Sequence, residues 1–141
     1  MSALTVARAQ GLFNLVGGGW PLLHLRSFER VFGPKTDVWL QRTTAGLLAT
    51  TGWSLLRTGP APESLGQARR AGIGSAVTLL AVDLVYVPLG RIRPTYLLDA
   101  AMQAGWLAAW CRYGMPRCGR HDGRHAGGKP QDGTRSAPRA R

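Results

Sequence analysis

The stretch from Asp83 to Asp99 holds the residue types and spacings with the clearest potential for chemistry. Counting outward from Arg91, Tyr86 and Tyr96 each lie five residues away, and Asp83 and Asp99 each lie eight away. If the apolar segments on either side form antiparallel helices, both carboxyls lie at one depth and both phenols lie nearer the turn. Ionisable groups inside apolar helices are candidates for binding a proton or a ligand, and paired carboxyls also for catalysis.

Two further ionisable residues are expected at the same end of the molecule. Each aspartate lies five residues from the nearer proline of the turn, or roughly 7 Å below its helix end at 1.5 Å per residue. Arg42 follows Asp37 by five residues and should reach a similar depth, and His24 ends the first apolar segment. We therefore predict one polar layer, which consists of Asp83, Asp99, Tyr86, Tyr96, Arg42 and His24.

Two interpretations of this layer remain open from the sequence. In the first, Arg42 forms buried ion pairs with the aspartates, which fix the register of the helices, and Arg91 or Arg93 reaches down toward them. The tyrosines are then interface anchors. In the second, the layer is a small polar pocket that binds a head group, a quinone-like ligand or a proton.

Four apolar segments are expected to position these residues: 6–25, 38–56, 71–87 and 95–111. A helix of about 20 residues covers a bilayer core of roughly 30 Å. Residues 71–82 contain no polar stripe beyond Ser75 and Thr78, although every helix of a soluble bundle needs one. The sequence therefore predicts an all-α fold, an integral membrane four-helix bundle. Because the third and fourth segments are short, a soluble four-helix bundle is the alternative.

The connections between these segments carry turn and interface signals. Residues 26–37 are either an amphipathic helix at the membrane interface or an ordinary loop, stopped by Gly33 and Pro34. Residues 58–67 are expected to be a linker. Small residues four apart mark the faces expected to contact neighbouring helices: Gly72 with Ala76, Gly46 with Thr50, and Ala101 with Gly105 and Ala109.

Length and charge divide the chain into two parts. The 141 residues carry a net charge of +11, and the mean hydropathy of -0.08 averages the apolar segments with a basic end. We predict a transmembrane domain over 1–113 and a disordered basic tail over 114–141, which contacts anionic lipid head groups. Nucleic acid is not an expected partner, because the tail has no aromatic residue after His121 for stacking.

The distribution of basic residues predicts the orientation. Lys and Arg are more frequent beside the two termini and in the 57–70 connection than at the opposite helix ends. By the positive-inside rule both termini of this multi-pass membrane protein are expected to be cytoplasmic. The preference for Arg over Lys (16 to 2) indicates a bacterial source, so the expected location is the bacterial inner membrane. The expected partners are the lipid bilayer and either a second copy or another membrane protein.

No metal, cofactor or catalytic motif is predicted. Cys111, Cys118, His121 and His125 are suitable zinc ligands, but their spacing does not match the usual pairs of ligands. Gly17, Gly18 and Gly19 are not followed by the Lys-Ser/Thr of a phosphate-binding loop, and no nucleophile with a matching base is found. An enzyme is therefore not the first expectation.

Three local patterns resemble a known family. They are Trp20-Pro21-Leu22 at the end of a glycine-rich segment, Phe32-Gly33-Pro34 in the connector, and the run from Arg42 to Leu48. Together these are similar to small bacterial four-helix membrane proteins of the DoxX-like kind, over roughly residues 5–113. The resemblance implies a fold and a membrane location, and some such proteins are associated with quinone or thiol redox chemistry.

The expected function is that of a small membrane protein with a structural or interaction role. The alternative is a membrane-embedded binder or enzyme that acts on a lipid-like or quinone-like ligand through the Asp/Tyr layer.

Overall fold

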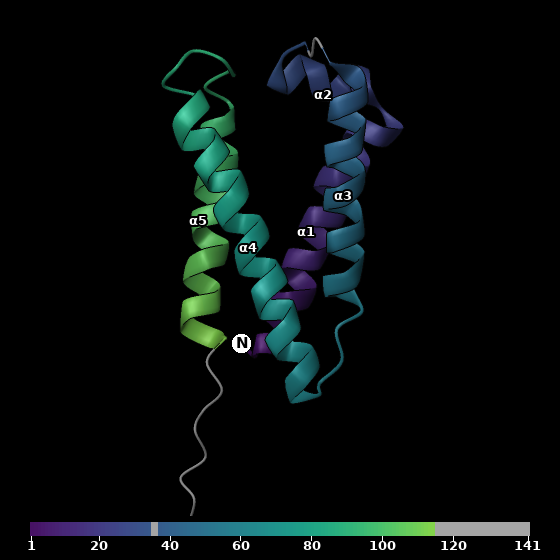
Figure 1. Cartoon of the computed structure of the whole chain (residues 1–141), viewed down its shortest axis with the longest axis vertical. Helices are drawn as coiled ribbons and strands as arrows, with labels where there is room; N and C mark the ends of the chain where they lie inside the picture. The colour runs from purple at the N-terminus through teal and green to yellow at the C-terminus, as the bar shows by residue number, and fades with distance from the viewer. Residues whose placement is uncertain (35–36, 115–141) are drawn as a thin grey trace, which may run out of the picture.

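The chain is all-α, as predicted, and its helices form two antiparallel hairpins (Figure 1). The computed structural model describes residues 1–34 and 37–114. Predictions for the basic tail, including Cys118, His121 and His125, therefore fall outside the described residues, apart from Gly114. The described helices are α1 (Ala3–Leu23), α2 (Leu25–Phe32), α3 (Val38–Leu56), α4 (Pro62–Tyr86) and α5 (Tyr96–Tyr113).

Helices α1 and α3 form the first hairpin and contact each other through their backbones. A Cβ atom added to Gly11 would lie 2.6 Å from the Leu56 nitrogen and 2.8 Å from the Gly52 oxygen. About two turns further along α1, a Cβ on Gly18 would lie 2.5 Å from the Ala45 oxygen. Small residues allow such close approach, so α1 and α3 fit together only because these positions lack bulk.

The small residues that set the helix contacts are only partly the predicted ones. Gly72 and Ala76 are buried, as expected. Gly46, however, has nothing within 4 Å of an added Cβ, and Ala101 and Gly105 are exposed. Four-residue spacing alone did not identify the contact face, since an Ala- and Gly-rich chain contains such pairs on every side.

Helices α4 and α5 form the second hairpin, joined by the turn that contains Gly90 at φ 66°. Helix α4 begins at Pro62 and not at residue 71, so the predicted linker over 58–67 was too long. Proline is favoured in the first turn of a helix, because its missing N–H would have no partner there. Glu63, also in that turn, suits the positive end of the helix dipole.

Residues 26–37 were predicted to form either an amphipathic helix or a loop. The structure has a helix there, α2, which ends at Phe32 before Gly33. Pro21 lies close to the end of α1, and the His24 side chain accepts a hydrogen bond from the Ser27 N–H at 3.3 Å as the cap of α2. Phe28 and Phe32 stack at 4.7 Å between ring centroids, and Phe32 lies 4.8 Å from the Tyr96 ring. Helix α2 thereby connects the first hairpin to the start of α5.

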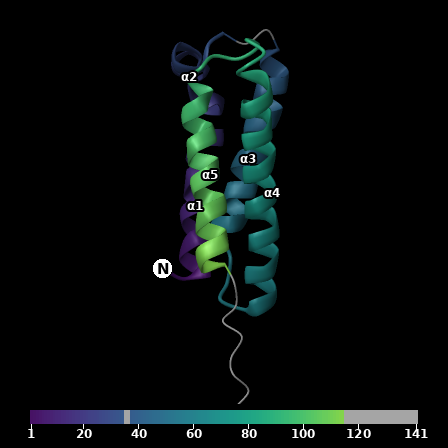
Figure 2. The same cartoon turned by 90° about the vertical axis from the view of Figure 1, so that its left-hand side faces the viewer.

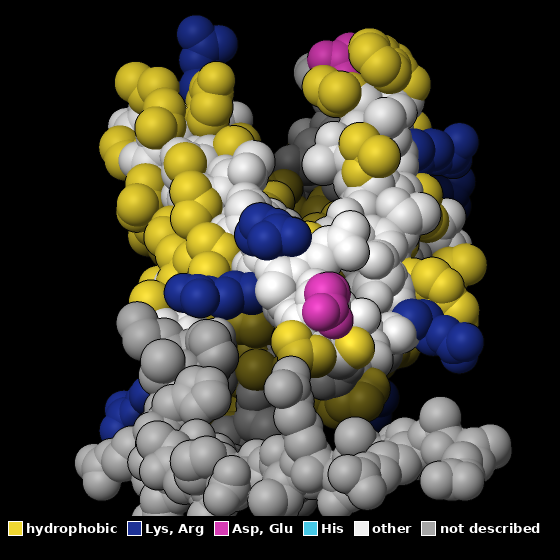
Figure 3. Space-filling view, turned by 60° about the horizontal axis from the view of Figure 1, so that its bottom comes forward, with side chains coloured by type: hydrophobic (Ala, Val, Ile, Leu, Met, Phe, Trp, Pro, Cys, Tyr) yellow, Lys and Arg dark blue, Asp and Glu magenta, His cyan; other side chains and the backbone are white. Residues whose placement is uncertain are grey.

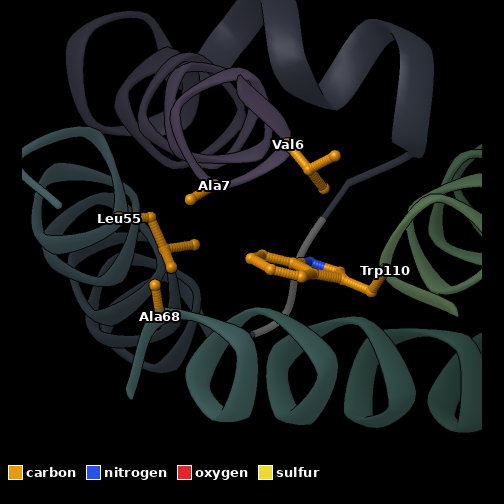
Figure 4. Close-up of a cluster of buried hydrophobic side chains, with 5 residues drawn as sticks. All are labelled: Val6, Ala7, Leu55, Ala68 and Trp110. Atoms are coloured by element: carbon orange, nitrogen blue, oxygen red, sulfur yellow. The ribbon is translucent and has the colours of Figure 1, made fainter. Parts of the chain in front are cut away.

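At the opposite end, side chains of four helices meet in a small hydrophobic core (Figure 4). Trp110 of α5 lies at its centre and is fully buried. The side chains around it are Val6 and Ala7 from α1, Leu55 from α3 and Ala68 from α4.

The N-terminus, the α3–α4 connection and the end of α5 lie at one end of the molecule, whereas α2 and the α4–α5 turn lie at the other (Figures 1 and 2). This arrangement of helix ends matches the up-and-down topology expected from four apolar segments. Among residues 1–34 and 37–114, no helix is both long enough and apolar enough to cross a membrane.

The α1–α3 contact predicts a position-dependent effect of adding one methyl group. A Cβ on Gly52 would lie 2.7 Å from the Gly11 oxygen, so Gly52→Ala should force the backbones apart and cost about 1–3 kcal/mol. Gly46→Ala in the same helix should be neutral or slightly stabilising, because Ala favours helix. Thermal unfolding followed by circular dichroism measures both, and equal midpoints for the two variants would contradict the close contact.

Candidate functional site

The interior of the bundle contains polar side chains that are almost completely shielded from solvent. Gln10, Asn14, Asp83 and Gln103 are each 2% exposed or less. They come from α1, α4 and α5. Their burial is unusual, because the side chains of Asn, Gln and Asp are mostly found on protein surfaces. Buried polar groups need hydrogen-bond partners, so the partners of these four residues define what the interior can do.

Gln10 makes the best-satisfied interactions of this group. Its Oε1 accepts a hydrogen bond from Trp110 Nε1 at 2.6 Å, and its Nε2 donates to the Gly72 carbonyl at 2.8 Å. A Cβ on Gly72 would lie 2.5 Å from Gln10 Oε1 and 2.7 Å from Trp110 Nε1. Glycine at this position therefore leaves the space in which α1, α4 and α5 are joined by two buried hydrogen bonds.

A pair of carboxyl groups lies toward the other end of the second hairpin. Asp83 of α4 and Asp99 of α5 are within hydrogen-bonding reach of each other, and Tyr96 lies close to both. Gln103 donates from Nε2 to Asp99 Oδ1 at 3.1 Å. Because an ionised carboxylate only accepts hydrogen bonds, a bond between two carboxyls requires a proton on one of them.

Several buried polar atoms have no hydrogen-bond partner within the described residues. They are Asp83 Oδ2, Gln103 Oε1, both side-chain polar atoms of Asn14, and Trp106 Nε1. Each such atom costs about 1–3 kcal/mol when left unpaired. Asp83 and Gln103 both interact with Asp99 and each has one buried oxygen without a partner, so this part of the interior can accept hydrogen bonds from a small donor.

The structure brings together half of the predicted polar layer. Asp83, Asp99 and Tyr96 lie next to one another, as the symmetric spacing about Arg91 indicated. Tyr86 is exposed, and so is Arg42 on α3. His24 is exposed too and acts as the cap of α2.

The expected ion pairs are not formed within the described residues. The charged group that acts on the Asp83 carboxyl is the Asp99 carboxyl, and Asp99 interacts with Gln103 and Asp83. Arg91 and Arg93 are exposed in the turn above and do not reach down to the aspartates. The carboxyl pair is thus surrounded by neutral groups rather than by guanidinium groups.

The polar residues that sequence reasoning missed share a simple signal. Gln10 and Asn14 are four residues apart in an apolar helix, and Asp99 and Gln103 are also four apart. Residues at this spacing lie on one helix face. The spacing of Gln10 with Asn14, and of Asp99 with Gln103, therefore indicates a polar stripe on α1 and on α5.

The described residues contain no group of three or more His, Cys, Asp or Glu side chains that could hold a metal ion. Cys111 is exposed and unpaired.

Comparison of the chain with protein-family models, with curated proteins and with solved structures gave no match.

The hydrogen bond between Gln10 and Trp110 predicts different effects for two tryptophan substitutions. Trp110→Phe leaves Gln10 Oε1 buried without its donor, whereas Trp106→Phe removes an Nε1 that has no partner. Trp110→Phe should therefore lower the free energy of unfolding by about 1–3 kcal/mol more than Trp106→Phe. Denaturation of both purified variants measures the difference, and an equal loss would show that the hydrogen bond contributes nothing.

Proposed function

We propose that this chain is a small multi-pass membrane protein with a structural or interaction role, whose four long helices lie in the bilayer. The observation that carries the proposal is the distribution of polarity. Amide and carboxyl side chains are buried alongside the small hydrophobic core, while many large hydrophobic side chains are exposed. A water-soluble bundle shows the opposite distribution, because burial of apolar surface is what stabilises it.

The hydrophobic exterior extends along both hairpins. Leu47 in the middle of α3 is 65% exposed and Leu98 on α5 is 72% exposed. Hydrophobic side chains cover much of the side formed by α4 and α5 (Figure 3). Further exposed apolar residues lie on all four long helices: Leu12, Val16, Trp39, Leu40, Trp53, Val77, Val82, Leu84, Val85, Leu97 and Met102.

Such a surface suits lipid as its neighbour. Soluble monomers rarely expose contiguous apolar patches of more than a few hundred Å². Lipid tails are as apolar as leucine, so the same side chains carry no exposure cost in a bilayer.

The helix ends support the proposed orientation. Arg57 lies over the Trp53 ring at 5.8 Å near the end of α3, and Trp39 lies near its start. Tryptophan is enriched at both membrane interfaces. In this proposal both termini are cytoplasmic, because the sequence has more Lys and Arg beside the two termini and in the 57–70 connection than at the opposite helix ends. The DoxX-like resemblance implies the same class and location.

A structural role is preferred over the alternative of a lipid-like or quinone-like ligand bound at the Asp/Tyr layer. The interior hydrogen bonds of Gln10 join three helices, which is a structural task. The two pockets described below lie at the ends of the bundle, and neither is lined by Asp83, Asp99 or Tyr96. The partners proposed are the bilayer and a second copy or another membrane protein at the apolar surface.

Extraction of membranes at alkaline pH tests the proposal. The full chain should stay in the membrane pellet, because helices inside the bilayer are not released when peripheral contacts are broken. Release into the supernatant together with peripheral proteins would refute the membrane location.

A substitution that adds one charge to the outer surface of α3 provides a second test of the membrane location. Leu47→Lys places a charge at the middle of α3, where a bilayer-facing lysine costs about 2.5–3.5 kcal/mol on insertion scales. The membrane-bound yield should fall. Gln67→Lys, at an exposed position near the start of α4, is the matched control and should not change that yield.

A further inference from the structure

A pocket of about 540 Å³ lies between the end of α2 and the α4–α5 turn. Its lining combines two arginines, Arg91 and Arg93, with apolar side chains that include Phe32, Val87 and Ile92. No acidic side chain is among the described residues that line it. The pocket therefore presents positive charge beside an apolar wall.

Arg93 contacts the end of α2 at this pocket. Gly33 has a φ of 89°, and a Cβ there would lie 2.8 Å from Arg93 Nε and 3.1 Å from its Cδ. The guanidinium also donates from Nη1 to the Arg30 carbonyl at 3.5 Å. A guanidinium has five N–H donors, so one such contact leaves most of them for a ligand. An arginine that is already positioned loses less entropy when it binds.

The chemical groups that the ligand needs follow from the side chains that line and adjoin the pocket. Arginine binds phosphate, like carboxylate, with paired hydrogen bonds. Next to the pocket, Leu89 is 64% exposed and Val31 is 42% exposed, so the apolar wall continues onto the outer surface. A ligand that fits both parts carries a phosphate and hydrocarbon chains on one molecule.

We propose that this pocket binds the phosphate of an anionic phospholipid, with Arg91 and Arg93 on the phosphate and the acyl chains along the adjoining apolar surface. The inference rests on the proposed membrane location. The site lies at the end of the bundle opposite the described chain termini (Figure 1).

A second arginine-bearing pocket provides a matched control. It has a volume of about 460 Å³ and is lined by Arg69, Arg70 and Ile73 of α4. Neither arginine there forms a hydrogen bond within the described residues. The substitution pairs Arg91→Gln with Arg93→Gln, and Arg69→Gln with Arg70→Gln, remove equal charge from opposite ends of the bundle.

The test is lipid binding to the purified full chain in neutral detergent, followed by native mass spectrometry with added phosphatidylglycerol. Loss of Arg91 and Arg93 should weaken binding by roughly tenfold or more, since both charged hydrogen-bond donors to the phosphate are removed. Loss of Arg69 and Arg70 should leave binding unchanged. An equal reduction in both double variants, or none in either, would overturn the proposal.

Two further experiments distinguish a phospholipid from other phosphate compounds and provide variants for the case in which the double variant does not fold. Inorganic phosphate and glycerol 3-phosphate should not displace phosphatidylglycerol, and displacement at equal concentration would show a phosphate site without lipid selectivity. Gly33→Ala keeps the charge but displaces Arg93, so it should also weaken binding. If the double variant does not fold, Arg93→Gln and Gly33→Ala carry the test, and unchanged binding in both overturns the proposal.

The two proposals fail in different ways. Release of the chain by alkaline extraction would refute the membrane location itself. A chain that stays in the membrane but binds phosphatidylglycerol equally well without Arg91 and Arg93 would refute only the lipid site.

Discussion

The Gln10 side chain is the interaction on which the rest of the bundle depends. It accepts from Trp110 and donates to the Gly72 carbonyl, so one amide joins the first hairpin to both helices of the second. Its position follows from the neighbouring residue, because Gly11 brings α1 against the backbone of α3 and fixes the rotation of α1. Gly72 then leaves the space that the amide and the indole need.

This hydrogen bond explains why a polar interior is compatible with a stable fold. Where the surroundings are apolar on both sides, helices gain little from hydrophobic association and rely on close contact and hydrogen bonds. The glycines between α1 and α3 allow the close contact, and Gln10 makes the hydrogen bonds. The unpaired atoms of Asn14, Asp83 and Gln103 oppose this, at about 1–3 kcal/mol each, so the interior is not optimised for stability alone.

From the sequence, the position of a residue along its helix was predicted well, but the side of the helix on which it lies was predicted poorly. Segment 38–56 coincides with α3, and the spacing about Arg91 brought Asp83 next to Asp99. Arg42 was expected beside them because residue counts gave it the same depth. A helix turns by about 100° per residue, however, and its facing side depends on contacts such as those of Gly11 and Gly18. Pro62 was read as part of a linker, although proline also starts helices.

The most direct measurement of the polar interior and apolar exterior is tryptophan quenching by brominated lipids. Variants that keep a single tryptophan compare Trp53, which is 56% exposed on α3, with the fully buried Trp110. In reconstituted vesicles Trp53 should be quenched strongly and Trp110 weakly. Equal quenching of both, or of neither, would contradict a bundle that faces lipid with its apolar side chains and encloses its polar ones.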